Sequence, residues 1–166
     1  PSFQNAKKSI YVAMFYFTNK NILQELIKAK NRGVDVKVIV DASFAKDFSK
    51  YINIMRENEV PVKVENWAGK MHCKLAVIDD NITLTGSLNW TNSAVNFNDE
   101  NFLKIQNPRI AKETIKYFYT LWKSIPEKWL YAIPDAEGVD SKYSCKDGID
   151  NNHNGLTDKN DPKCQL

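Results

Sequence analysis

The chain has 166 residues, of which 43% are hydrophobic and 26% are charged, enough for one domain of ordinary size with a sizeable core and an appendage. No stretch approaches the roughly 18 consecutive apolar residues of a membrane-spanning helix, so we expect no transmembrane segment. Residues 1–134 carry 19 Lys/Arg and 13 Asp/Glu, and residues 135–166 carry 4 and 7, so a body of net charge +6 precedes an end of −3. The basic body favours a polyanionic partner, but it does not separate DNA from RNA or anionic lipid.

The first half of the chain alternates strand and helix patterns. Three apolar runs predict strands, at Ser9–Phe17, Val34–Val40 and Val62–Glu65. Two amphipathic helices separate them. The first is capped by Thr18 or Asn19 and ends near Gly33, and the second runs roughly from Ala45 to Asn58. This alternation predicts an α/β fold with a mixed β-sheet flanked by helices.

The second half begins with a predicted hairpin. Strands at Cys73–Ile78 and Ile82–Thr85 are joined by a tight-turn sequence, and a further strand is expected at Phe102–Ile105. Pro108 then opens a long helix through about Trp122. Its aromatic face indicates core packing rather than a platform for stacked bases.

The character of the sequence changes after this helix. We expect a main α/β domain at residues 1–131, a polar linker without periodicity at 132–144, and a small loop-rich module at 145–166.

Four polar residues near the hairpin suit a phosphoryl group. On an extended backbone His72 and Lys74 project to one side while Cys73 turns away, and Ser87 and Asn89 repeat this arrangement. A neutral imidazole can attack phosphorus, an ammonium can hold a non-bridging oxygen, and a hydroxyl and a carboxamide can donate hydrogen bonds. Each residue alone also fits a structural role, but the combination at fixed spacing favours a phosphodiester-cleaving site.

The spacing His-x-Lys-x-x-x-x-Asp followed by Gly-Ser-x-Asn resembles the motif of the phospholipase D superfamily, also called the HKD phosphodiesterases. The resemblance implies that His72 forms a covalent phosphohistidine while Lys74, Ser87 and Asn89 hold the phosphate. Glu100 stands where the family carries an acidic residue that orients the His. Asp79 is the third letter of the motif, but it ends an apolar strand, so we expect a structural contact there.

The motif occurs once in this chain, whereas the family pairs two motifs around one active site. The resemblance therefore implies a homodimer in which one His72 attacks phosphorus and the partner's His72 protonates the leaving oxygen. Such a pair predicts a bell-shaped pH profile. No metal cofactor is expected for catalysis.

The C-terminal module has oxygen-bearing residues at alternate positions before a glycine, as in the first half of an EF-hand loop. It resembles the Asp-Gly-Ile-Asp-Asn calcium-binding repeats of secreted microbial proteins. The resemblance implies a structural Ca²⁺ held by Asp150, Asn152, Asn154, the carbonyl of Leu156, Asp158 and Asp161. The alternative is a disordered terminus rich in turn residues.

Three cysteines divide into a pair and a singleton. Cys145 and Cys164 bracket the calcium loop, and a disulfide between them would indicate a secreted or otherwise extracytoplasmic protein; free thiols in a cytosolic protein are the alternative. Cys73 is expected to be a buried thiol that faces away from His72.

The leading hypothesis is a non-specific endonuclease that hydrolyses DNA, with RNA left open as a second nucleic acid substrate. A phospholipase D-type lipid phosphodiesterase is the second hypothesis. A non-catalytic nucleic-acid-binding module is the third, and the complete set of motif residues speaks against it.

Overall fold

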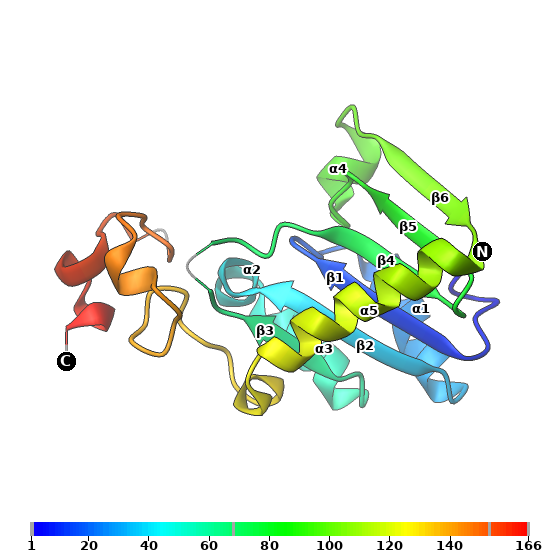
Figure 1. Ribbon diagram of the computed structural model, residues 1–166, viewed down its shortest axis with the longest axis horizontal. Helices are drawn as coiled ribbons and strands as arrows, with labels where there is room; N and C mark the ends of the chain where they lie inside the picture. Colours follow the sequence, from blue (N-terminus) through cyan, green and yellow to red (C-terminus); the bar gives the residue numbers. More distant parts are fainter. Residues whose placement is uncertain (1, 68, 153, 166) are drawn as a thin grey trace.

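The computed structural model describes residues 2–67, 69–152 and 154–165 (Figure 1). Across these residues one mixed sheet has six strands in the order β3-β2-β1-β4-β5-β6. The strands are β1 Ser9–Met14, β2 Asp35–Asp41, β3 Val62–Glu65, β4 Lys74–Ile78, β5 Ile82–Gly86 and β6 Phe102–Gln106. The fold class expected from the sequence is confirmed.

Strand directions bring distant parts of the chain to one edge of the sheet. Strands β1, β2 and β3 are parallel, and β4, β5 and β6 continue the sheet as antiparallel neighbours. The carboxyl ends of β1, β2, β3 and β5 therefore lie at the same edge as the starts of β4 and β6. In open α/β sheets this edge is the usual place for a ligand site.

Helices cover both faces of the sheet. The helices α1 Lys20–Asn31, α2 Ala42–Asp47 and α3 Ser49–Glu57 pack on one face, and α5 Pro108–Ser124 lies across the other (Figure 1). Strand β1 is buried along its whole length, as a strand covered on both faces should be. Phe118 and Trp122 of α5 belong to the cluster beneath that helix, so its aromatic face is core, as expected.

Some element boundaries differ from the sequence expectation. The helix expected from about Ala45 to Asn58 is two helices, because Phe48 leaves the helical conformation (φ −129°, ψ 33°) and stacks on Phe44 with ring centroids 5.6 Å apart. Asp41 starts α2 earlier, since its side chain accepts a hydrogen bond from the Ser43 N–H. The first helix is capped by Asn19.

A buried lysine joins the end of α5 to the sheet. Lys63 of β3 is 1% exposed, and its Nζ donates to the carbonyl oxygens of Trp122 and Ile125 at 3.0 and 2.8 Å and to Glu127 Oε1 at 2.7 Å. These carbonyls lack partners within the helix, so Lys63 satisfies the C-terminus of α5.

The C-terminal residues fold into turns and short 3-10 helices at Ser144–Lys146, Asp158–Asn160 and Pro162–Cys164. Two lysines of the body donate to backbone carbonyls of this module: Lys46 to Asn152 at 2.6 Å and Lys70 to Asn151 at 3.0 Å. None of the helices in the described ranges is both long and apolar enough to cross a membrane.

Candidate active site

His72 lies just before β4, at the sheet edge where the carboxyl ends of the parallel strands meet. The Phe15 N–H donates to the Cys73 carbonyl at 2.9 Å, which continues the pairing of β1 with β4 and fixes the backbone next to His72. The imidazole is exposed and packs on the ring of Phe15, with centroids 4.5 Å apart. The nucleophile implied by the motif is thus open to solvent on a supported backbone.

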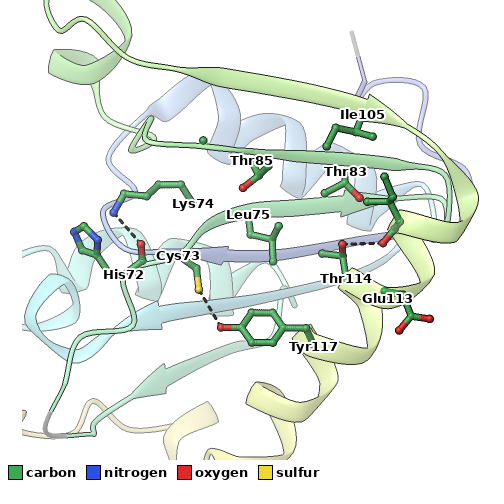
Figure 2. A pocket seen from close by; sticks show the side chains of 12 residues that line it. His72, Cys73, Lys74, Leu75, Thr83, Thr85, Ile105, Glu113, Thr114 and Tyr117 are labelled. Carbon is green, nitrogen blue, oxygen red and sulfur yellow. Dashed lines mark hydrogen bonds between the residues drawn. The ribbon is translucent and has the colours of Figure 1, made fainter.

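Lys74 is the first residue of β4 and lies beside His72 (Figure 2). Its Nζ donates to the His72 carbonyl oxygen at 2.9 Å and lies 4.9 Å from the centroid of the Phe15 ring. Partial desolvation of the imidazole, and after it the Lys74 charge, lowers the pKa of His72, while Asp41 opposes this effect. A lowered pKa favours the neutral imidazole, which is the nucleophilic form.

Gly86 closes β5 where two backbones approach closely. Its φ is +149°, and a Cβ there would lie 2.2 Å from the carbonyl oxygen of Asn101. Glycine is therefore required at this position. Directly after it, the Ser87 N–H donates to Asn101 Oδ1 at 2.7 Å, and the Asn101 N–H donates back to Ser87 Oγ at 3.1 Å.

Glu100 lies within the same set of contacts. Its carboxylate accepts hydrogen bonds from the Ser87 hydroxyl and from Asn98 Nδ2, the latter at 3.0 Å. The Ser87 hydrogen bond, followed by that of Asn98, lowers the pKa of Glu100, and Lys74 adds an electrostatic contribution. Among the described residues no hydrogen bond joins Glu100 to His72, so the orienting role of Glu100 stays a prediction.

Asn89 is half-buried, and no donor among the described residues reaches its buried Oδ1. A rotation of the amide would exchange this oxygen for the NH₂ donor that a phosphate requires. Asn89 is thus able to make a further hydrogen bond.

A pocket of about 560 Å³ extends from His72 towards α5 (Figure 2). Lys74 and Thr85 line its catalytic end, and Thr114 and Tyr117 of α5 line the other. Cys73 was expected to be buried, but it is half-buried and also lines the pocket. Its Sγ lies 3.6 Å from the Tyr117 hydroxyl, towards α5.

Asp79 lies at the opposite end of β4 from His72, as expected for a structural residue. Its carboxylate accepts four hydrogen bonds of 2.7–3.1 Å from the backbone N–H groups of Lys7, Lys8 and Ser9. Burial alone would raise the pKa of Asp79, but these N–H groups bring it below its ordinary value. Asp79 thus ties the start of β1 to the hairpin.

Sequence reasoning missed two buried carboxylates near His72. Asp41 and Glu65 end β2 and β3 and are 2% and 4% exposed. The sequence does carry a signal for them: each of the apolar runs that form β2 and β3 ends with an acidic residue, at the end of the strand that faces the site.

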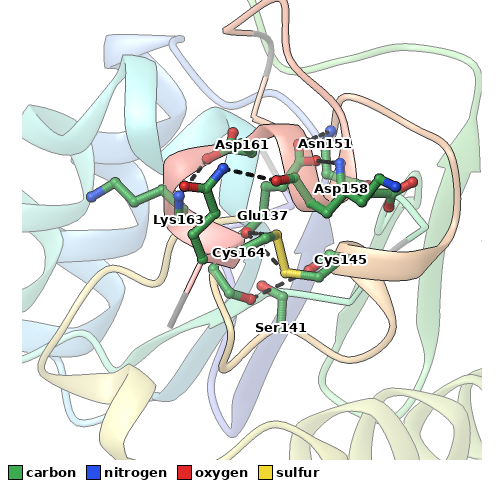
Figure 3. The surroundings of a disulfide bond; sticks show 12 residues. Glu137, Ser141, Cys145, Asn151, Asp158, Asp161, Lys163 and Cys164 are labelled. Atoms are coloured by element: carbon green, nitrogen blue, oxygen red, sulfur yellow. Dashed lines mark hydrogen bonds between the residues drawn. A yellow bond between two sulfur atoms is a disulfide. The ribbon is translucent and has the colours of Figure 1, made fainter.

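The Cys145–Cys164 disulfide is present, with Cα atoms 5.6 Å apart (Figure 3). Glu137, which sequence reasoning had placed in the linker, is fully buried next to it and accepts hydrogen bonds from the N–H groups of Asn151 and Asp158, both at 2.7 Å. This carboxylate holds the two halves of the module together.

The six expected calcium ligands are only partly gathered. Asp161 accepts hydrogen bonds from the amides of Asn152 and Asn154, and Asp150 accepts them from the N–H groups of Asn154 and Gly155. Asp158 instead accepts from the N–H groups of residues 147 and 148, both at 3.0 Å, and Leu156 is exposed. In the described ranges no three acidic, His or Cys side chains cluster as a metal site would require.

Comparison with known proteins gives consistent matches. Residues 2–122 match the family model described as cardiolipin synthase, PLD-like domain. The chain is 33% identical over 132 residues to a mitochondrial cardiolipin hydrolase of Xenopus laevis, covering 80% of this chain and 63% of that protein. It is 28% identical over 117 residues to a phospholipase D of Rickettsia typhi, covering 70% and 57%. The chain therefore spans less than two thirds of these curated relatives.

Comparison with solved structures also finds a phospholipase D family member. Nuc from Salmonella typhimurium, described as a phospholipase D family member, superposes with a TM-score of 0.71 at 29% identity, over 75% of this chain and 84% of that one. NucT from Helicobacter pylori shares the fold, with a TM-score of 0.70 at 24% identity over the same shares.

Proposed function

This chain belongs to the phospholipase D superfamily, since the PLD-like domain model matches residues 2–122, and on that premise we propose that it is a phosphodiesterase with His72 as nucleophile. The observation that carries the proposal is an exposed His72 with the Lys74 ammonium beside it; partial desolvation and the Lys74 charge lower the pKa of this imidazole.

The proposed reaction has two displacements at phosphorus. A nitrogen of neutral His72 forms a bond to phosphorus as the bond to the leaving oxygen breaks, and the partner's His72, starting as imidazolium, gives its proton to that oxygen. The partner's imidazole, now neutral, takes a proton from water as the water oxygen attacks the phosphohistidine, and the P–N bond breaks, returning the imidazole of His72. Lys74 and the Asn89 amide would neutralise charge on the non-bridging oxygens. In this scheme the chain's own residues suffice, without a catalytic metal.

A homodimer would supply the second histidine. Exposed apolar side chains lie on both sides of Glu100 in the sequence: Val95 of α4 Asn92–Asn96 is 49% exposed, Phe97 just after α4 is 79% exposed, and Phe102 and Leu103 of β6 are 48% and 57% exposed. Exposed apolar side chains this close to the motif support an interface there. Phe97→Glu with Leu103→Glu should give an inactive monomer in analytical ultracentrifugation, whereas Tyr131→Glu, at an 85% exposed position, should stay dimeric and active. An active monomeric double variant would refute the shared site.

We propose nucleic acid as the substrate because residues 1–134 carry a net charge of +6. A lipid head group is the second candidate, favoured by the relatives named mitochondrial cardiolipin hydrolase. Both are phosphodiesters, so the same site chemistry serves either.

One assay separates them. The assay compares wild type with His72→Ala and with a control, His153→Ala, which replaces the other histidine of the chain. Each protein is mixed with supercoiled plasmid or with cardiolipin vesicles in excess EDTA. The nuclease proposal expects plasmid cleavage by wild type and His153→Ala but not by His72→Ala. Intact plasmid with hydrolysed cardiolipin would establish the second candidate, and loss of activity in EDTA would contradict metal independence.

We also propose that the C-terminal module binds Ca²⁺ through Asp150, Asn152, Asn154 and Asp161, with rearrangement of Asp158 and Leu156. The contacts of Asp161 with the amides of Asn152 and Asn154, and of Asp150 with the Asn154 backbone N–H, support this. Calorimetric titration with CaCl₂ tests it: wild type should bind one ion and Asp161→Ala none. The disulfide supports an oxidising, extracytoplasmic location.

A further inference from the structure

Two buried carboxylates lie side by side at the end of the sheet that carries His72. Asp41 and Glu65 are paired in register on the parallel strands β2 and β3 and are 2% and 4% exposed. Paired residues on parallel strands project to the same face. Two neighbouring buried carboxylates cannot both be ionised without a large cost in free energy.

Asp41 uses both of its oxygens. Oδ1 accepts hydrogen bonds from the N–H and the hydroxyl of Ser43, and Oδ2 accepts one from the Met71 N–H at 2.8 Å. Met71 is itself 6% exposed and belongs to the cluster beneath α5. Asp41 therefore fixes the backbone immediately before His72.

Glu65 accepts a hydrogen bond at only one of its two carboxylate oxygens. Its Oε1 accepts a hydrogen bond from the Trp67 N–H at 2.8 Å, while no donor among the described residues reaches its buried Oε2. Burial is the main cause that raises the pKa of Glu65 to about 7; the Asp41 charge adds to this, whereas the Trp67 hydrogen bond and Lys70 oppose it. Glu65 is thus suited to carry a proton in the folded protein.

The pair holds both ends of the connection from β3 to His72, with Glu65 bound to Trp67 and Asp41 bound to Met71. Glu65 also lines a pocket of about 210 Å³ together with Lys70, Met71, His72, Cys73 and Tyr117. Trp67, Gly69 and Leu121 also line this pocket, and the charge of Asp41 acts on Glu65 from β2.

We propose that Asp41 and Glu65 are positioning residues that hold His72 in its catalytic place while Glu65 is protonated, and that ionisation of Glu65 releases this hold. A second negative charge beside Asp41, with one oxygen lacking a donor, is relieved by admitting water. Glu65 lines a pocket, but its Oε2 is buried, so we expect water to reach this oxygen as the backbone held at Trp67 and Met71 shifts, and His72 to shift with it. The proposal rests on the proposed phosphodiesterase function.

The test compares pH profiles of kcat for wild type, Glu65→Gln and Asp41→Asn, with Glu57→Gln of α3 as the exposed control. At pH 8, about one unit above the Glu65 pKa of about 7, about a tenth of Glu65 keeps its proton. The kcat ratio of Glu65→Gln to wild type should therefore rise from about 1 at pH 6 to as much as about 10 at pH 8. KM should change little.

The other variants have different expectations. Asp41→Asn presents an NH₂ group to one of its present donors, so kcat should fall at every pH. Glu57→Gln should superimpose on wild type. A Glu65→Gln profile that superimposes on wild type would overturn the proposal, as would a folded Glu65→Gln enzyme without activity at pH 6.

A second readout does not need turnover. The NMR titration of His72, assigned with the His153→Gln variant, should report an additional inflection near pH 7 in wild type that is absent in Glu65→Gln. If wild type cleaves no phosphodiester but the inflection is present, the proposed function fails and the coupling stands. If wild type is active and neither readout changes in Glu65→Gln, the inference alone fails.

Discussion

The Lys74 ammonium donates to the backbone carbonyl of His72 at 2.9 Å, so the cation of the motif is held beside the proposed nucleophile before any substrate is present. Lys74 also contributes to the lowered pKa of His72. In the proposed mechanism the two residues act together: the Lys74 ammonium binds the negatively charged phosphate oxygens and helps to keep the His72 imidazole neutral.

Replacing either residue should remove activity to different degrees. His72→Ala should lower kcat by roughly 10⁴-fold or more, as loss of a nucleophile does. Lys74→Met should lower kcat by about 10²–10³-fold, because the cation that binds the phosphate oxygens is lost. It should also move the acidic limb of the pH–kcat profile to higher pH, because the Lys74 charge no longer disfavours the imidazolium form of His72. Steady-state kinetics from pH 4 to 9 measures both. Lys20→Met, at an exposed lysine of α1, is the control, and an unchanged acidic limb in Lys74→Met would contradict this coupling.

Gly86→Ala should disrupt the site without touching a motif side chain. A Cβ would lie 2.2 Å from the Asn101 carbonyl oxygen, so the backbone beside Ser87 and Glu100 must move. We expect a kcat loss of about 10²-fold, since small displacements in an active site are costly. Gly33→Ala also has a positive φ, but nothing lies within 4 Å of its Cβ, and it should cost only stability. Wild-type kcat in folded Gly86→Ala would show that the close approach has no catalytic role.

Asp79→Ala should affect stability rather than catalysis. The variant loses four hydrogen bonds from backbone N–H groups, which should cost about 1–3 kcal/mol in the free energy of unfolding. Asp80→Ala is a matched control, because Asp79 and Asp80 have similar positive φ values of 53° and 56°. Urea denaturation compares them; equal losses in the two variants would mean that the hydrogen bonds contribute nothing.

The Asp79 contribution should also depend on pH. Its folded-state pKa lies below the ordinary 3.8, so the charged form stabilises the fold above that value. This contribution is lost as pH falls through the lowered pKa. The difference between wild type and Asp79→Ala should therefore shrink only in strong acid, below pH 3.8.

The contribution of Glu65 to the free energy of unfolding should depend on pH in the opposite direction. Its pKa is raised from 4.5 to about 7, so the unfolded chain ionises first and wild type loses stability as pH rises between these values. The loss is on the order of 3 kcal/mol and is complete above pH 7. Glu65→Gln cannot ionise, so its stability relative to wild type should increase from pH 5 to pH 8 in urea denaturation. A constant difference would contradict the buried, protonated carboxyl.

The sheet and the motif could be predicted because both depend on local patterns. Apolar runs gave the strands, and the spacing of His72, Lys74, Ser87 and Asn89 placed four polar groups at one sheet edge. The pairing of Asp41 with Glu65 could not be predicted this way, because it depends on the register of β2 against β3. The break at Phe48 depends on packing against Phe44, which no helical periodicity reports.

The same reasoning reached its limit in the C-terminal module. The cysteine pairing follows from two thiols that bracket one loop, and the disulfide is present. Glu137 joins the halves of the module from 21 residues before Asp158, and no ligand spacing includes it. Asp158 accepts hydrogen bonds from the backbone N–H groups of residues 147 and 148 and does not lie with Asp161 in one ligand set. These contacts are tertiary, so the spacing of ligands in the sequence does not predict them.

The most direct measurement is the chemical state of His72 during turnover. Wild type is mixed with substrate, quenched within one turnover under conditions that preserve phosphoramidates, digested and mapped by mass spectrometry. A nucleophilic His72 predicts a substrate-derived phosphoryl adduct on the peptide that contains His72, absent from His72→Ala and unaffected in His153→Ala. Rapid turnover without this adduct, or an adduct on another residue, would contradict the account.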